Sequence, residues 1–248
     1  PNFLVNIDER QSLAVRAARH VPVVFDDPDR FTRKGLLQSR SLLDNGSAAN
    51  AANPTQKFLH EVADSARQAS GLVRAAWENY KTPVDYGIIP VDLTKVAAMI
   101  KADLPTRLYY VGYRHNAFDT HVQQVEQHQR LLTYVSDAVS GFMKDLERIG
   151  RADDVTLLVF SEFGRRAAEN TSLGTDHGTA NHMYVIGHTV KGGHYGKAPS
   201  LTDLDDGGNL KYTVDFRSVY ASVIENWMGY KNSSAILHKD FDKFQLWS

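Results

Sequence analysis

Residues 107–160 decide the fold class of this chain: they contain RLYYVGY (107–113), VEQHQRLLTYVSDAVSGFMKDLERI (125–149) and DVTLLVF (154–160). The two outer runs, rich in β-branched, aromatic and other apolar residues, are typical of buried strands. The middle segment repeats apolar residues every three, four or seven positions and ends at Gly150, which predicts a long helix. Strand, helix and strand in this order predict a parallel βαβ unit with helices on both faces of the sheet.

Further elements are predicted on both sides of this unit. They are a short strand at 21–25, a helix at 55–80 with Thr55 as cap, a helix at 92–103, a strand at 182–187 and a helix at 215–229. Residues 41–54 are rich in Asn, Ala and Ser and predict a flexible surface loop. We therefore expect one α/β domain over residues 1–248, with a mainly parallel central sheet sandwiched between helices.

The composition excludes several classes of protein. With 28 Lys and Arg against 29 Asp and Glu, the chain has no basic surplus that would indicate a nucleic-acid partner. It has no cysteine, so disulfides, thiolate metal sites and a cysteine nucleophile are excluded. No apolar run is long enough to predict a membrane span. The first residue is Pro1, and we expect that part of the natural N-terminal region is missing.

Three polar clusters lie next to the predicted core strands. They are RHNAFDTH (114–121), SEFGRR (161–166) and GTDHG (174–178). Ligands of open parallel sheets bind beyond the carboxyl ends of the strands, so we expect these clusters to converge at one edge.

The clusters contain candidate ligands for a divalent metal ion: Asp119, His121 and His177. Two imidazoles and one carboxylate suit a zinc-like ion and leave a position open for water or substrate. Zinc is the first choice, with manganese, calcium or magnesium as alternatives. Each residue also has a simpler interpretation: Asp119 can cap the next helix, His121 can be a surface residue, and His177 can belong to a polar turn.

Other charged residues extend the candidate site. Glu162 follows a hydrophobic strand, so it needs a partner, either the metal or an arginine. Arg165 and Arg166 carry forked donors that match phosphate or sulfate oxygens, or they clamp a structural carboxylate. His128 lies seven residues after His121 on the same helical face, where it either approaches the site or packs beside its apolar neighbours.

Four ordered motifs carry a resemblance to a known family: AFDTH (117–121), FSEFGRR (160–166), GTDHGTA (174–180) and VDFRSVY (214–220). Together they resemble the bacterial domain-of-unknown-function family 1501, most clearly over residues 55–229. The resemblance implies the alkaline phosphatase and sulfatase-like superfamily, with a parallel sheet between helices. It also implies export, because related proteins often carry a twin-arginine signal.

The resemblance implies roles for individual residues. Asp119 and His121 correspond to the superfamily's first ligand group, Glu162 to the Asp of the second group, and His177 to the last histidine. Phe163 stands where the second group normally has a histidine, and the N-terminal segment that supplies a nucleophile elsewhere is not visible. Ser161 is interpreted as a turn or cap residue and not as that nucleophile.

Three hypotheses follow. In the first, the protein is a metal-dependent hydrolase of a small anionic phosphate or sulfate ester, in which Glu162 acts as ligand or base and Arg165 stabilises the transferring anion. In the second, it is a catalytically degenerate, exported binding or scaffold protein that keeps the fold and one ion. In the third, the histidine clusters are structural and a partner binds the loop at 44–54.

Overall fold

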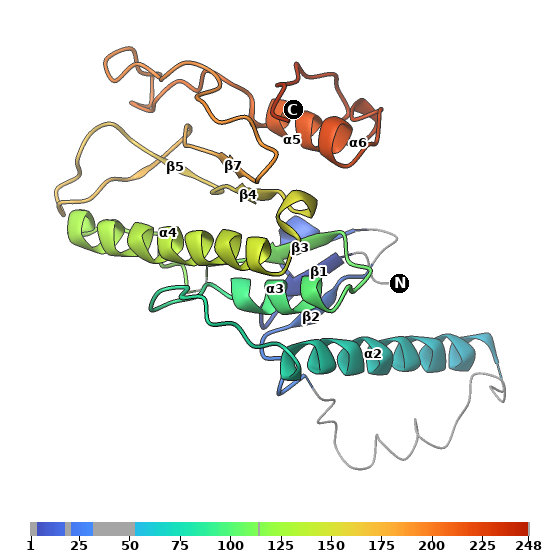
Figure 1. Ribbon diagram of the computed structural model, residues 1–248. Helices are drawn as coiled ribbons and strands as arrows, with labels where there is room; N and C mark the ends of the chain where they lie inside the picture. Colours follow the sequence, from blue (N-terminus) through green and yellow to red (C-terminus); the bar gives the residue numbers. More distant parts are fainter. Residues whose placement is uncertain (1–3, 18–20, 32–52, 114, 248) are drawn as a thin grey trace. The chain divides into compact units, whose positions relative to one another are not determined.

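The computed structural model describes residues 4–17, 21–31, 53–113 and 115–247, which form two compact units (Figure 1). The first unit comprises residues 1–115 and 134–149, and the second comprises 116–133 and 150–248. Each unit contains helices and strands, so the predicted α/β class is confirmed. The single domain over 1–248 stays a prediction. Most of the predicted loop at 41–54 lies outside the described residues.

A three-stranded parallel sheet forms the centre of the first unit. Its strands are β2 (Val23–Phe25), β1 (Leu4–Ile7) and β3 (Leu108–Val111), in the order β2-β1-β3. All four residues of β1 are buried, as expected for the central strand of a parallel sheet. This strand was not predicted, because a four-residue run interrupted by Asn6 carries little periodic signal. The strands at 21–25 and 107–113 are confirmed, but the predicted burial of the second is wrong, since β3 has an exposed Leu108 and three half-buried residues.

The helices predicted at 55–80, 92–103 and 125–149 are confirmed as α2 (Pro54–Glu78), α3 (Leu93–Lys101) and α4 (Gln124–Arg148). α2 packs against α3. The prediction that Thr55 caps α2 is wrong, since Thr55 lies inside the first turn. The helix begins at Pro54, whose fixed φ suits the first helical position, and the carbonyl of Asn53 accepts the amide of Lys57.

A buried carboxylate connects α4 to the segment that follows α2 in the first unit. Asp145 is fully buried and accepts hydrogen bonds from the hydroxyls of Tyr80 at 2.5 Å, Tyr86 at 2.7 Å and Thr82 at 2.9 Å. Arg148 Nε lies 2.7 Å from the same carboxylate. A charge at this depth is tolerated because three hydroxyl donors and one guanidinium compensate for its lost hydration.

The second unit contains two small antiparallel pairs. β4 (Leu157–Val159) pairs with β7 (Tyr184–Ile186), and β5 (Gly164–Arg165) pairs with β6 (His177–Gly178). The strands at 154–160 and 182–187 are therefore confirmed, but the parallel βαβ unit is wrong: among the described residues, β4 pairs with β7 and not with β3. The predicted burial of β4 is only partial, since all three of its residues are half-buried. An apolar run also carries no information about the strand's partner or direction.

The predicted mainly parallel central sheet is likewise confirmed only for the three strands of the first unit. The C-terminal helix predicted at 215–229 begins as α5 (Phe216–Ser222) and continues as the π-helix η4 (Val223–Trp227). Gly229 follows with a φ of +78°, as expected for a residue that ends a helix. A short helix, α6 (Ser234–Leu237), packs against α5. In the part of the chain that is described, no helix has the length and apolarity needed to cross a membrane.

Candidate metal centre

Asp119 and His121 lie in the segment between β3 and α4. Thr120 between them is only 3% exposed, whereas both of its neighbours reach solvent. Alternate residues of an extended segment point to the same side. This geometry explains the Asp-x-His spacing, because burying the middle residue turns the carboxylate and the imidazole toward the same accessible surface.

The buried Thr120 is fixed by polar contacts. Gln124, in the first turn of α4, donates to the Thr120 carbonyl at 3.0 Å and to its hydroxyl at 2.9 Å. The Gln124 side-chain carbonyl also accepts the hydroxyl of Thr175 at 2.9 Å. His128 Nδ1 lies 3.3 Å from the Thr120 hydroxyl. Gln124 therefore joins the segment that carries Asp119 and His121 to the segment that carries His177.

His177 is placed by the short β5–β6 pair, in which it lies directly opposite Arg165. Its ring stacks on the ring of Phe163, with centroids 3.9 Å apart and an interplanar angle of 10°. Backbone packing in this pair is close: a Cβ on Gly164 would lie 1.8 Å from the carbonyl oxygen of Ala180. Cross-strand pairing and ring stacking together define the orientation of the His177 imidazole.

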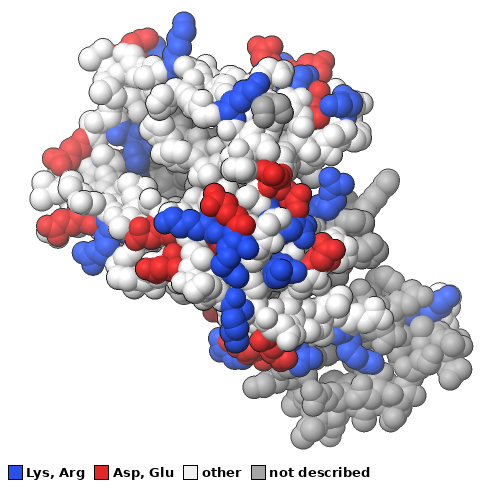
Figure 2. Space-filling view, viewed as in Figure 1, with Lys and Arg blue, Asp and Glu red and all other residues white. Residues whose placement is uncertain are grey.

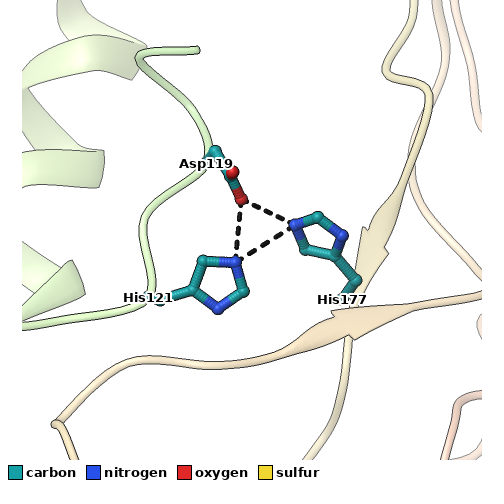
Figure 3. Close-up of side chains that lie close together, drawn as sticks. All are labelled: Asp119, His121 and His177. Atoms are coloured by element: carbon teal, nitrogen blue, oxygen red, sulfur yellow. Dashed lines mark hydrogen bonds and ion pairs between the residues drawn. The ribbon is translucent and has the colours of Figure 1, made fainter.

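Three ligand atoms converge in the second unit (Figure 3). Asp119 Oδ1 lies 2.6 Å from His177 Nε2 and 2.8 Å from His121 Nε2, and the two Nε2 atoms are 3.2 Å apart. Ligands about 2.0 to 2.1 Å from a tetrahedral ion lie about 3.3 Å from one another, so only small side-chain movements are needed to fit one. The predicted grouping of these three residues is therefore what the structure shows, and its donor set fits a divalent ion.

The electrostatics of the cluster favour a cation. The hydrogen bond from His177 and a second one from His121 lower the pKa of Asp119, and they outweigh the opposing effect of partial burial. Asp119 is consequently ionised at neutral pH. An ion that displaced the two Nε2 protons would meet one negative charge and two nitrogen lone pairs at one point on the surface.

A second group of side chains surrounds His121. Asp176 Oδ1 faces the other ring nitrogen of His121, Nδ1, at 3.6 Å. Asn170 Nδ2 donates to Asp176 at 3.2 Å and to the carbonyl of His121 at 3.1 Å. The hydrogen bond from Asn170 also lowers the pKa of Asp176, against the effect of burial. A carboxylate behind a histidine is the usual partner of a metal-bound imidazole, because it selects the tautomer and holds the ring.

The backbone behind the cluster is tightly packed and unusual in conformation. A Cβ on Gly174 would lie 2.3 Å from the carbonyl oxygen of His121. Leu173 and Gln123 have φ values of +59° and +43°, in the left-handed region that non-glycine residues seldom occupy. Such conformations are costly and concentrate at functional sites, where the surrounding structure maintains them.

Arg165 forms hydrogen bonds with the backbone of both segments that carry the candidate ligands. Nη1 donates to the carbonyl of Thr175 at 2.7 Å, and Nη2 donates to the carbonyl of Phe118 at 2.6 Å. The guanidinium also lies 5.0 Å from the centroid of the Phe163 ring and 3.9 Å from Asp119 Oδ1. Burial lowers the pKa of Arg165, which stays far above neutrality because guanidinium groups titrate near 12.5.

The other predicted residues lie elsewhere. Glu162 is exposed in the segment after β4, and among the described residues neither Arg165 nor Arg166 forms an ion pair with it. The alternative of an arginine partner is therefore not what the described residues show, because β4 ends at Val159 and Glu162 is exposed to solvent. Its role as ligand or base stays a prediction, since the converging group contains only Asp119, His121 and His177. The hydroxyl of Ser161 donates to the carbonyl of Phe163, in agreement with its interpretation as a turn residue.

Sequence reasoning missed the supporting residues Gln124 and Asn170 and gave Asp176 no role beyond a turn. Uncharged amides have no spacing that marks them as part of a site. The signal available for Asp176 was its position next to His177, but its contact is with His121, more than fifty residues away in the sequence.

A family model described as "Protein of unknown function (DUF1501)" matches residues 101–239, more than half of the chain. The chain belongs to the DUF1501 family. The DUF1501 match includes the three converging residues, Asp176 and Arg165, so the whole candidate centre lies in the family region. Comparison with curated proteins and with solved structures gave no match.

Proposed function

We propose that this DUF1501 protein is a metal-dependent hydrolase of phosphate or sulfate esters, with its ion held by Asp119, His121 and His177. The observation that carries the proposal is the convergence of Asp119 Oδ1 and two imidazole Nε2 atoms within 3.2 Å of one another. Placement in the alkaline phosphatase and sulfatase-like superfamily belongs to the same proposal, supported by the order of the sequence motifs.

The donor set favours zinc or another transition metal. Imidazole nitrogens suit borderline ions, whereas calcium and magnesium prefer oxygen ligands. Three protein ligands leave a position open, which is typical of catalytic zinc sites and not of structural ones. The ligand side chains are between 37% and 46% exposed, so a substrate can reach them.

A bound divalent ion would supply Lewis-acid chemistry at an ester oxygen and make water more acidic. Asp119 contributes the negative charge that holds the ion. His121 and His177 contribute neutral nitrogen donors, which requires that each ring present an unprotonated Nε2. Glu162 is proposed as a general base that takes a proton on its carboxylate from the attacking group.

The first test measures metal binding directly. Protein purified without chelator or affinity tag is analysed for metal content and titrated with zinc by calorimetry. We expect one ion per chain, and no binding in His177→Ala. His182→Ala is the control, because His182 is an exposed histidine of the same unit outside the cluster. Full zinc occupancy in His177→Ala would remove this residue from the ligand set.

The second test measures turnover. The full-length protein is assayed on phosphate and sulfate monoesters and diesters, with Asp119→Ala as control. We expect metal-dependent hydrolysis in the wild type and none in Asp119→Ala. Activity that survives in Asp119→Ala would place the chemistry elsewhere in the protein.

A second candidate function is an exported scaffold or binding protein that keeps one ion without turnover. The observation in its favour is Phe163, whose aromatic ring stacks against His177 and offers no ligand atom. Stoichiometric metal together with the absence of hydrolysis on the whole ester panel would support this alternative. Export itself is tested by fractionating cells that produce the natural protein.

A further inference from the structure

We propose that Arg165 is a positioning residue that fixes the spacing of the metal ligands, and that it does not bind the substrate anion. The inference deepens the proposed function and rests on its metal site. It changes the role expected of this arginine from its sequence alone, where its forked donors suggested contact with phosphate or sulfate.

The first observation is that one guanidinium bridges the two segments that carry the ligands. Nη2 donates to the carbonyl of Phe118, the residue before Asp119, at 2.6 Å. Nη1 donates to the carbonyl of Thr175, two residues before His177, at 2.7 Å. Both bonds are short for hydrogen bonds between nitrogen and oxygen. The distance between the two carbonyls therefore follows the planar geometry of the guanidinium.

The second observation is that Arg165 is coupled to His177 by two further routes. The two residues lie opposite each other in the β5–β6 pair. The Phe163 ring contacts both of them: it stacks on the His177 imidazole and lies under the Arg165 guanidinium. A shift of Arg165 would consequently move the strand pair and the ring that orient the ligand.

The third observation concerns the access of Arg165 to solvent. Its side chain is only 18% exposed, against 46% for His177 and 37% for Asp119. Its Nη2 also lies 3.5 Å from the buried hydroxyl of Thr120. Its terminal nitrogens thus face protein oxygens, while the ligand atoms face the accessible surface.

The test is a zinc titration of four proteins by calorimetry: wild type, Arg165→Lys, Arg165→Gln and Arg130→Lys. Lysine keeps the charge without the planar fork, and glutamine keeps one amide donor without the charge. Loss of groups that support metal ligands typically weakens binding about 10- to 100-fold, and we expect this loss in both Arg165 variants. Arg130→Lys is the control, because Arg130 is an exposed arginine of the same unit outside the cluster, and we expect wild-type affinity.

The absorption spectrum of the cobalt-substituted protein gives a readout that general destabilisation does not change. At saturating cobalt, both Arg165 variants should show altered d–d bands, because the ligands are held at different angles. Arg130→Lys should reproduce the wild-type spectrum. Near-UV circular dichroism establishes that each variant is folded before it is compared.

The outcomes separate this inference from the proposed function. A wild type that binds no zinc contradicts the metal site itself. Wild-type zinc affinity and cobalt spectra in both Arg165 variants, with loss of inorganic phosphate binding, would overturn the positioning role and assign Arg165 to the anion. If a variant does not fold, nitrogen NMR of the wild type with labelled arginine decides. Separate Nη signals of Arg165 that do not change on adding phosphate mean that the guanidinium is held by the protein, and they support the proposal. Averaged Nη signals that shift with phosphate overturn it.

Discussion

At the scale of single residues, neighbouring side chains of the candidate centre have different roles: some are candidate metal ligands, and others hold those ligands in place. Asp119 and His121 face the proposed ion position, while Thr120 between them is buried and held by Gln124. Asp176, next to the ligand His177, supports the other histidine. Residues adjacent in the sequence therefore contact different side chains of the site. Each exposed candidate ligand is held by a buried or hydrogen-bonded partner.

The contact between Asp176 and His121 gives a prediction at this scale. Asp176→Asn removes the negative charge that faces His121 Nδ1 at 3.6 Å, so the ring loses the partner that favours its metal-binding tautomer. We expect zinc affinity to fall about 10-fold or more by calorimetry, with little change in thermal stability without metal. Asp206→Asn is the control, because Asp206 is an exposed carboxylate of the same unit. Equal affinity in the two variants would leave Asp176 without a role in binding.

At the scale of elements, the centre depends on the close approach of the segment 170–174 to the start of α4. The amides of Gln123 and Gln124 donate to the carbonyls of Ser172 and Leu173, each at 2.9 Å. Asn170 holds this turn by accepting the amides of Ser172 and Gly174. The turn therefore acts as a support for the His121 backbone, and glycine is required where the two backbones meet.

Gly174→Ala tests this support. The new Cβ would lie 2.3 Å from the carbonyl oxygen of His121, so one of the two segments must move. We expect a loss of roughly 1 to 3 kcal/mol in the free energy of unfolding, together with weaker zinc binding. Urea denaturation and calorimetry measure the two effects. Gly192→Ala should change neither, since no atom lies within 4 Å of its Cβ position.

The link between α4 and the segment after α2 gives a second prediction at this scale. Asp145→Asn leaves three hydroxyl donors and Arg148 without the buried charge that they surround. Removing one partner of a buried ion pair costs on the order of 3 kcal/mol, and we expect a loss of this size in urea denaturation. Glu147→Gln, which removes an exposed charge from the same helix, should be nearly neutral. A neutral Asp145→Asn would mean that the buried network adds no net stability.

At the scale of the whole molecule, stability should depend on pH at both extremes through this network. Burial opposes ionisation of Asp145, but the hydrogen bonds from Tyr80, Tyr86, Arg148 and Thr82 outweigh burial and lower its pKa. Since the folded pKa lies below the unfolded value, the stability from Asp145 is complete above about pH 4 and is lost as pH falls through the folded pKa.

Tyr80 makes the stability of the protein depend on pH at the alkaline end. Burial, together with the hydrogen bond to Asp145, raises its pKa from 10.0 to about 12. A raised folded pKa contributes stability that is complete below the unfolded pKa, and this stability is lost between about pH 10 and pH 12. Urea denaturation across this range should show falling stability at both ends. In Asp145→Asn, the fall in stability at acid pH that comes from Asp145 should disappear. Part of the fall in stability at alkaline pH should remain, because Tyr80 stays buried.

Metal binding should stabilise the protein as a whole. A ligand at 100 times its Kd adds about 2.7 kcal/mol, which corresponds to about 5 to 10 °C in Tm for a chain of this size. We expect zinc to raise the Tm measured by differential scanning calorimetry, and a chelator to reverse the increase. His177→Ala should show no shift with zinc. An equal shift in this variant would mean that zinc binds elsewhere.

Figure 2 shows acidic and basic side chains interspersed on the visible face, as the near-neutral net charge of −1 leads one to expect.

The sequence by itself determined the positions of most helices and strands, because amphipathic periodicity and buried apolar runs are local properties. It also indicated Asp119, His121 and His177, since residue type limits which side chains can hold a metal. Only the tertiary structure decided that β4 pairs antiparallel with β7, that Arg165 bridges the carbonyls of Phe118 and Thr175, and that Asp176 faces His121. These contacts join segments distant in the sequence, and their geometry depends on how the backbone packs, which no local pattern encodes.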